Sequence, residues 1–381
     1  MIVLKGMAWD HPRGYDPMVA SANEFNKKYP DCEIIWEKRS LQAFADRPIE
    51  QMAFDYDFMV IDHPHVGEAS RKDLLLELNN YEKYHKDLNI LSKQSVGKSH
   101  ESYKFGNNQY ALAIDAATPV SAYREDLIDK IPRTYEDVVR LAENKKVMWP
   151  IKPVDSISSF NSIAANIGSP INETDKTFID KSIAISILKM MKRLSDLVPL
   201  DCLNMNPIET LEYMSNNNDK AYCPLLYGYS NYSRKGFRES IIKFTNTPSF
   251  NQDKNNCSGS QIGGTGLAIS KQTTNIDLAL EYAFWVASAQ CQKSLYYFSG
   301  GQPGNLEAWN DKSINDDSNN FFKNTLETLE RSWLRPRYDG YMYYQDKAGT
   351  IINNYLSSDN SEELVIDELS AEFERSFYVN K

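Results

Sequence analysis

The sequence lacks any hydrophobic run approaching the ~18 consecutive apolar residues that a membrane-spanning helix needs. It also has little positive charge, because 42 Lys and Arg residues stand against 52 Asp and Glu residues, for a net charge of −10 at pH 7. Nucleic-acid binding depends on clustered basic side chains that neutralise phosphates. This charge balance therefore predicts that the chain has no nucleic-acid partner.

Cysteine is scarce and scattered, with five residues in 381 and no CxxC spacing. An odd number of scattered cysteines does not indicate a disulfide framework. We therefore expect most of the cysteines to be small apolar core residues. They are Cys32, Cys202, Cys223, Cys257 and Cys291.

The first residues also lack a secretory signal, because the polar segment 9–13 arrives before an apolar stretch of the required length can form. Two interpretations stay open. Either the chain was cut from an exported precursor, or Met1 is the true start and the protein is cytoplasmic.

Length and composition predict a globular α/β protein of two domains. A chain of 381 residues is too long for one ordinary core, and 41% hydrophobic with 25% charged residues is typical of folded proteins. Short apolar runs alternate with helical stripes near the start, which predicts parallel strands at 2–8, 33–37 and 58–61. The intervening helix is expected to have Asp16 as its N-cap and Pro17 at its first position.

Further elements follow from the same patterns. Thr134 and Asp137 predict a capping box before a helix, and the Asn- and Asp-rich segment 310–320 predicts a loop or an irregular helix start. Strands are expected at 110–114, 147–149, 221–229 and 266–270. Helices are expected at 178–198, 207–216, 275–288, 290–298, 321–332, 348–356 and 362–377.

Candidate binding residues follow the first three strands, since ligands of open parallel sheets bind beyond the carboxyl ends of the strands. Polar and aromatic side chains gather there, and two of the loops share the tripeptide Asp-His-Pro. The expected ligand contacts are Trp9, Asp10, His11, Arg39, His63 and His65.

A metal site is the alternative for these loops, built from Asp10, His11, Asp62, His63 and His65. The His-x-His step alone is a weak signal, and no HExxH pair supports it. We therefore predict ligand hydrogen bonding or a structural role in the loops, where Asp side chains commonly cap turns and helices, rather than a metal, and we predict no cofactor.

Aromatic residues make up 12% of the chain, and several adjoin predicted loops or strand ends. Flat rings with polar tips suit sugars and other ring compounds, although core packing is as good an explanation for each ring alone. Arg335 could hold a carboxylate or cap a helix. These further candidates are Trp149, Tyr227, Tyr229, Trp333 and Arg335.

The glycine run 263–266 does not fit a phosphate loop, because the Gly-Lys-Ser/Thr ending is missing and the run leads into a strand instead of a helix. It indicates a close backbone approach at a crossover or at the wall of a cleft. No Gly-x-Ser-x-Gly nucleophile motif is present, so the sequence gives no catalytic residue.

Three segments carry a resemblance to the extracellular solute-binding proteins of ABC transporters, family 1. Residues 110–127 (YALAIDAATPVSAYREDL) resemble the segment that crosses the hinge of these proteins. Residues 131–137 (IPRTYED) resemble their Pro-x-Thr-Trp-Glu-Glu segment. Residues 263–270 (GGTGLAIS), with the helix 279–289 and the turn 300–304, resemble the returning crossover and the helices after it.

The resemblance implies the type II periplasmic-binding-protein fold: two lobes, each a mainly parallel sheet with helices on both faces, joined by hinge crossovers. The implied lobes are 1–114 with 264–309, and 115–263 with 310–381. Asp115 and Gly264, on the crossovers, join the expected ligand contacts. A monomer would close on a small polar ligand, such as a carbohydrate, and deliver it to a membrane permease from the periplasm.

A missing export signal would favour a cytosolic sensor or an enzyme on the same fold. The thiaminase I type resembles these lobes and uses a cysteine in its cleft with a carboxylate partner. Cys223, four residues before Tyr227, is the nearest match in sequence. A reactive cysteine therefore discriminates between the binding protein and the enzyme.

Overall fold

The computed structural model describes residues 1–40, 48–172, 178–251 and 259–380. The chain divides into two compact units. The first consists of Met1–Ala116, Gly263–Asn315 and Arg337–Asp339, and the second of Ala117–Ile262, Asp316–Pro336 and Gly340–Lys381. The lobes expected from the sequence differ from these units, because they place the whole of 310–381 in the second lobe. That division into lobes stays a prediction.

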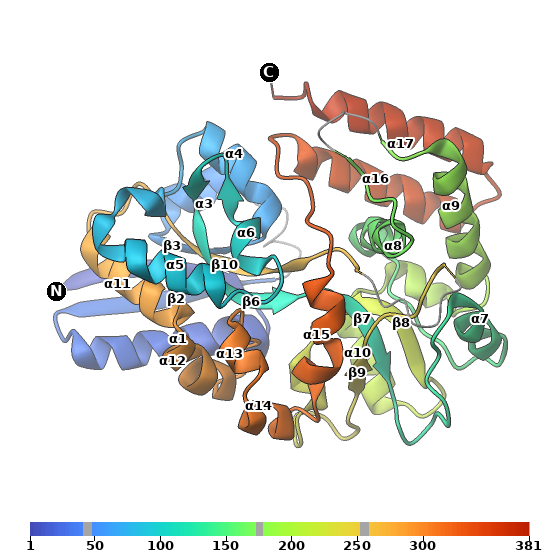
Figure 1. Cartoon of the computed structure of the whole chain (residues 1–381), viewed down its shortest axis with the longest axis horizontal. Coiled ribbons are helices and arrows are strands. Elements are labelled where there is room, and N and C mark those ends of the chain that lie inside the picture. Colours follow the sequence, from blue (N-terminus) through green and yellow to red (C-terminus); the bar gives the residue numbers. More distant parts are fainter. Residues whose placement is uncertain (41–47, 173–177, 252–258, 381) are drawn as a thin grey trace. The chain divides into compact units, whose positions relative to one another are not determined.

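The first unit is built on a five-stranded sheet in the order β2-β1-β3-β10-β6 (Figure 1). Strand β1 pairs in parallel with β2 and β3, as the alternation of strands and helices predicts, whereas β10 pairs antiparallel with β3. The strands are β1 (Ile2–Trp9), β2 (Cys32–Arg39), β3 (Phe58–Ile61), β6 (Ala111–Ala117) and β10 (Gly263–Ile269), and a small hairpin adds β4 (Lys104–Phe105) and β5 (Asn108–Gln109).

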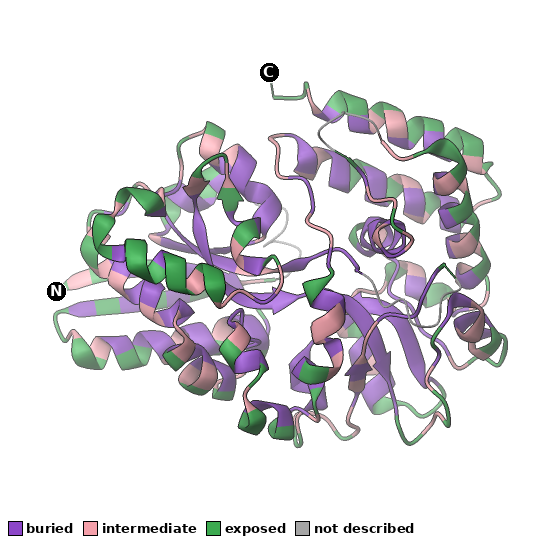
Figure 2. Cartoon of the chain, viewed as in Figure 1, coloured by how far each residue is buried: buried purple, intermediate pink, exposed green. Residues whose placement is uncertain are grey.

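Helices surround this sheet and bury their apolar faces in one core. Met18, Ala22 and Phe25 recur at helical spacing in α1 and are buried with strand residues such as Met7 and Val60. Figure 2 shows β3 and β6 buried and α5 mostly exposed. The helices are α1 (Pro12–Lys28), α3 (Ile49–Asp55), α4 (Val66–Arg71), α5 (His85–Lys93), α6 (Ser99–Ser102), α11 (Ile276–Ala287), α12 (Ala289–Cys291), α13 (Leu306–Trp309) and α14 (Lys312–Asp317).

The expected start of the first helix is wrong by about one turn. Helix α1 begins at Pro12 with His11 as its N-cap, and Pro17 lies inside the helix. The His11 side chain accepts a hydrogen bond from the Arg13 backbone, which satisfies one of the unpaired amides of the first turn. A histidine therefore caps the helix in place of Asp16, the residue that the sequence had suggested.

The second unit has a smaller sheet, in the order β8-β7-β9, with both pairs antiparallel. Helices α8, α16, α17 and α9 pack against one another beside it (Figure 1). Its elements are β7 (Pro119–Tyr123), β8 (Tyr222–Tyr227), β9 (Lys243–Thr245), α7 (Tyr135–Glu143), α8 (Pro153–Asn166), α9 (Lys181–Ser195), α10 (Pro207–Asn216), α15 (Phe321–Glu330), α16 (Tyr341–Leu356) and α17 (Glu362–Ser376).

The α/β class is confirmed, and the sheets are mixed rather than mainly parallel. In the first sheet β10 runs antiparallel to β3 beside the parallel strands β1, β2 and β3, and in the second sheet β7 is antiparallel to both of its neighbours. The capping box of Thr134 and Asp137 is confirmed. The expected strand 147–149 is wrong, because Val147 makes only a single bridge to Tyr222.

Candidate functional site

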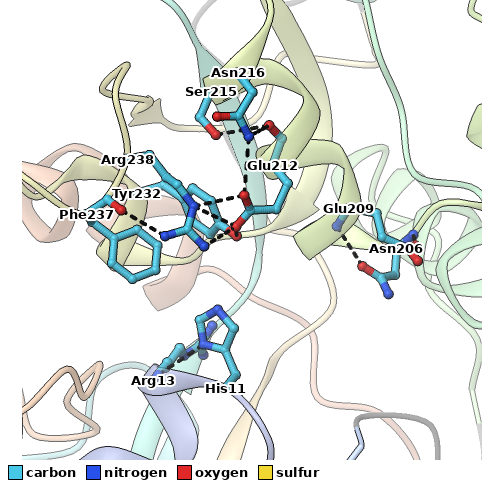
Figure 3. Close-up of polar contacts among 10 residues, drawn as sticks. All are labelled: His11, Arg13, Asn206, Glu209, Glu212, Ser215, Asn216, Tyr232, Phe237 and Arg238. Atoms are coloured by element: carbon cyan, nitrogen blue, oxygen red, sulfur yellow. Dashed lines mark hydrogen bonds and ion pairs between the residues drawn. The ribbon is translucent and has the colours of Figure 1, made fainter.

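The loop after β1 is held by local polar contacts. Asp10 is exposed and pairs with Lys38, with 2.8 Å between Nζ and Oδ1. His11 is buried, and its Nδ1 accepts from the Arg13 amide at 3.0 Å (Figure 3). This contact requires an unprotonated Nδ1. Both residues were expected to contact a ligand, and that role stays a prediction beside the structural one seen here.

Asp115 and Arg13 form a buried ion pair between β6 and α1. Arg13 donates through Nε to Oδ2 at 2.7 Å and through Nη2 to Oδ1 at 2.5 Å. Both side chains are almost inaccessible, at 4% for Arg13 and 0% for Asp115. Because both carboxylate oxygens already accept from Arg13, the pair fixes the crossover strand, and a ligand contact of Asp115 stays a prediction.

Trp9 and Gly264 both lie in closely packed surroundings. The Trp9 ring belongs to the core of the first unit and lies against Gly14, where an added Cβ would come within 2.3 Å of the ring. Gly264 has a φ of +93°, and a Cβ there would lie 2.3 Å from the Asp115 carbonyl oxygen. The close backbone approach expected from the glycine run is therefore present.

The remaining residues of the first unit that the sequence singled out lie in two places. Arg39 is half-buried at the end of β2 and donates to the Tyr56 hydroxyl at 3.2 Å. His63 and His65 are buried in a short 3-10 turn that follows β3, and the Asp62 carboxylate caps this turn. No cluster of three or more metal-binding side chains occurs in the described ranges.

In the second unit, three expected contacts pack into the unit itself. Trp149 is 1% exposed and donates through Nε1 to the Ser159 hydroxyl at 3.2 Å. Arg335 is buried and donates to the Gln345 side chain at 2.9 Å. Tyr229 is buried with its ring edge against another tyrosine. Their ligand roles stay predictions.

Tyr227 and Trp333 flank the segment that leads into the returning crossover. Trp333 is half-buried and exchanges backbone hydrogen bonds with this segment, from Ile262 N and to Ser260 O, both at 2.8 Å. The half-buried Tyr227 accepts at its hydroxyl from Gln261 Nε2 at 2.7 Å. These two aromatic residues keep more exposed surface than the other candidates of this unit.

A small pocket lies beside Tyr227, with a volume of about 10 Å³, which is roughly the room that one water molecule needs. One side is apolar, from prolines and from leucines of β8, and the other is polar, from the first turns of α8. Such a mixture of lining groups suits a hydroxyl group together with the C–H face beside it. The lining residues are Pro119, Pro150, Asp155, Ser158, Ser159, Leu225, Leu226 and Tyr227.

The two serines of the pocket can donate hydrogen bonds to a ligand. Ser158 accepts from Gln261 Nε2 at 3.2 Å, and Ser159 accepts from the Trp149 indole, so each hydroxyl can give its own hydrogen to a ligand. Gln261 is held in turn by Asn161, whose Nδ2 donates to Oε1 at 2.8 Å. This network fixes the orientation of the polar wall.

Asp155 is the ionisable group of the pocket. It is 7% exposed, and its Oδ2 has no hydrogen-bond partner among the residues that the structure describes. Burial raises the pKa of Asp155 to about 8, Lys152 opposes the rise and Glu209 adds to it. The carboxyl group is therefore protonated at neutral pH and can both donate and accept.

Sequence reasoning missed α8 and with it Asp155, Ser158 and Ser159. The signals were Pro153 at the first helical position, an acidic residue in the first turn, and apolar residues at 157, 160 and 163. Serines lie between these apolar positions and obscure the helical pattern, because serine-rich segments are typical of loops.

The cysteines bear on the enzyme alternative. The four described cysteines are all buried, and burial raises the pKa of each thiol, to about 11 for Cys202 and about 12 for Cys291. A nucleophilic cysteine needs a lowered pKa and access to substrate. Cys223, the residue that the enzyme interpretation singled out, has its thiol pKa raised well above its usual range. Cys257 lies outside the described residues.

No family model matches the sequence. Solved structures are similar over nearly the whole chain. The maltose-bound MalE3 of T. maritima has a TM-score of 0.83 at 14% identity, covering 98% of this chain and 99% of that one. A ribitol-bound solute-binding protein of Agrobacterium radiobacter K84 has a TM-score of 0.80 at 17% identity, covering 98% of both chains.

A third similar structure is the ABC-transporter solute-binding protein of Thermotoga lettingae bound with α-D-tagatose. Its TM-score is 0.80 at 14% identity, covering 99% of this chain and 100% of that one. These matches cover both units of the chain. The chain therefore has the two-lobed α/β fold of the solute-binding proteins of ABC transporters, as the resemblance of its crossover segments implied.

Proposed function

We propose that the protein binds a small carbohydrate or polyol and supplies it to an ABC-type uptake system. The observation that carries this proposal is the pocket of the second unit. Its leucines and prolines offer an apolar wall for C–H faces, and Ser158, Ser159 and Asp155 offer donors and acceptors for hydroxyl groups. Neutral polyhydroxy compounds match this combination.

The ligands of the similar structures support the same class. They are maltose, ribitol and α-D-tagatose, all neutral and rich in hydroxyl groups. At 13–17% identity the likeness does not carry over individual contacts. The proposal for this chain therefore depends on its own pocket residues, and the similar structures supply the class of ligand to try first.

Binding without turnover is the second part of the proposal. None of the four described cysteines has an exposed or activated thiol, which disfavours the thiaminase-like alternative. A monomer, a permease partner and a periplasmic location belong to the proposal as well. Among the described helices, none is both long and apolar enough to cross a bilayer.

A thermal-shift panel tests the proposed class. The panel contains maltose, ribitol, D-tagatose, aliphatic amines and simple carboxylates. A ligand at a hundredfold excess over its Kd stabilises the folded state by ~2.7 kcal/mol, which raises the melting temperature by several degrees. We expect stabilisation by a neutral polyhydroxy compound. Stabilisation by amines or carboxylates alone would replace the carbohydrate class with a charged one.

A further inference from the structure

Asp155 and Asp115 are buried aspartates with opposite surroundings. Asp115 accepts twice from Arg13, so its negative charge is balanced. Asp155 is 7% exposed, lines the pocket, and its Oδ2 has no hydrogen-bond partner in the described part of the chain. A buried carboxylate without a partner is costly, and such a group lowers the cost by keeping its proton.

The groups around Asp155 come from three elements. Lys152, the residue before α8, favours the charged form of Asp155, and the acid Glu209 of α10 opposes it. At the start of α10, Glu209 Oε2 accepts a hydrogen bond from the backbone amide of Asn206 at 2.7 Å (Figure 3). The thiol of Cys223 on β8 faces Asp155 as well, and its own titration lies far above neutral pH. With its pKa raised to about 8, the Asp155 carboxyl group titrates near neutrality.

A ligand changes this balance. Asp155 lies in the first turn of α8, a helix of 14 residues, where the helix dipole favours a negative charge. Hydroxyl groups that enter the pocket donate hydrogen bonds to the carboxylate form and so lower its pKa. Ser158 and Ser159 can donate to the oxygens of the same ligand, which leaves Asp155 as the acceptor of the polar wall.

We infer that Asp155 holds a proton in the empty pocket and releases it when a hydroxyl-bearing ligand binds, so that affinity rises with pH through neutrality. The inference rests on the proposed function, because it concerns the same pocket. Between the pKa of the bound form and that of the empty form, each binding event releases up to one proton. Affinity then rises by up to about tenfold per pH unit.

The empty protein gives the first test, which needs no ligand. Aspartate labelled with ¹³C at the side-chain carboxyl is followed by NMR from pH 4 to 10. We expect one carboxyl signal to titrate near pH 8, and to be missing in Asp155→Asn. The exposed control Asp359→Asn should keep that signal. If Asp155 titrates near pH 4 in the empty protein, the inference fails, whether or not a ligand is known.

Calorimetry gives the second test. Maltose, ribitol and D-tagatose are titrated at pH 7 in phosphate and in Tris, whose ionisation enthalpies differ, and then in one buffer from pH 6 to 8. We expect proton release and a rising affinity for the wild type and for Asp359→Asn, and neither for Asp155→Asn. Binding that is independent of pH, or that takes up protons, contradicts the inference while the proposed function stands. The absence of binding by any probe at every pH contradicts the proposed function itself.

Discussion

At the scale of single residues, the two buried aspartates have different effects on stability. Asp115 is paired with Arg13 inside the first unit, where burial raises the pKa of its carboxyl group and the Arg13 guanidinium opposes this rise, so each partner depends on the other. Asp155 Oδ2 has no hydrogen-bond partner among the described residues of the second unit, and burial raises the pKa of this carboxyl group to about 8. Removing the partner of Asp115 should therefore destabilise the protein, whereas replacing Asp155 with a neutral amide should stabilise it at high pH.

Arg13→Ala should lower the free energy of unfolding by about 3–5 kcal/mol, because it leaves the Asp115 carboxylate buried without a partner. Lys38→Ala is the matched control, since it removes the exposed pair with Asp10 and should cost far less stability. Urea unfolding measures both. Equal losses in the two variants would mean that the buried pair is not structural.

Asp155→Asn should stabilise the empty protein at pH 8 and have little effect at pH 4. The folded state keeps the proton up to a pKa of about 8, whereas the unfolded chain loses it near its ordinary pKa of 3.8. The wild type therefore loses stability as pH rises between these values, and the amide does not. Melting temperatures across this range measure the difference. A constant difference between the variant and the wild type would contradict the raised pKa.

At the scale of elements, α8 shows where the sequence misleads. Its serines at positions 156, 158, 159 and 162 are buried rather than exposed, because the helix turns a polar face into the second unit. A pattern search treats such residues as solvent-facing and so misses the helix. In contrast, the sequence predicts α1 because Met18, Ala22 and Phe25 form an apolar stripe at helical spacing, and the error concerns where the helix starts and which residue caps it.

The crossover glycine offers an element-scale prediction. Gly264→Ala should destabilise the protein by well over 1 kcal/mol, because the new Cβ meets the Asp115 carbonyl at a positive φ. Gly236→Ala is the control, since its φ of +81° is similar but nothing lies within 4 Å. The difference in unfolding free energy between the two variants isolates the close approach. Equal losses would show that backbone strain alone matters.

At the scale of the whole molecule, the fold could be predicted further than the site. Alternating strands and helices, together with the crossover segments, indicated the α/β class and the resemblance. Similar structures at 14–17% identity show that this pattern tolerates almost complete replacement of side chains. The pocket could not be predicted in the same way, because Asp155 and Ser158 depend on which face of α8 is buried.

The central claim is that the pocket of the second unit binds a neutral polyhydroxy ligand. Ser158→Ala removes one hydrogen bond, typically worth about 0.5–1.5 kcal/mol, so it should weaken binding roughly two- to tenfold. Ser186→Ala, at an exposed position of α9, should leave the affinity unchanged.

Isothermal titration of the wild type and both serine variants, with recovery of the bound compound, is the most direct measurement. The ligand is the compound that stabilises the wild type most in the thermal-shift panel. The account predicts saturable binding of one unaltered molecule per chain, weakened by Ser158→Ala alone. Equal affinity in all three proteins, or chemical conversion of the recovered compound, would contradict it.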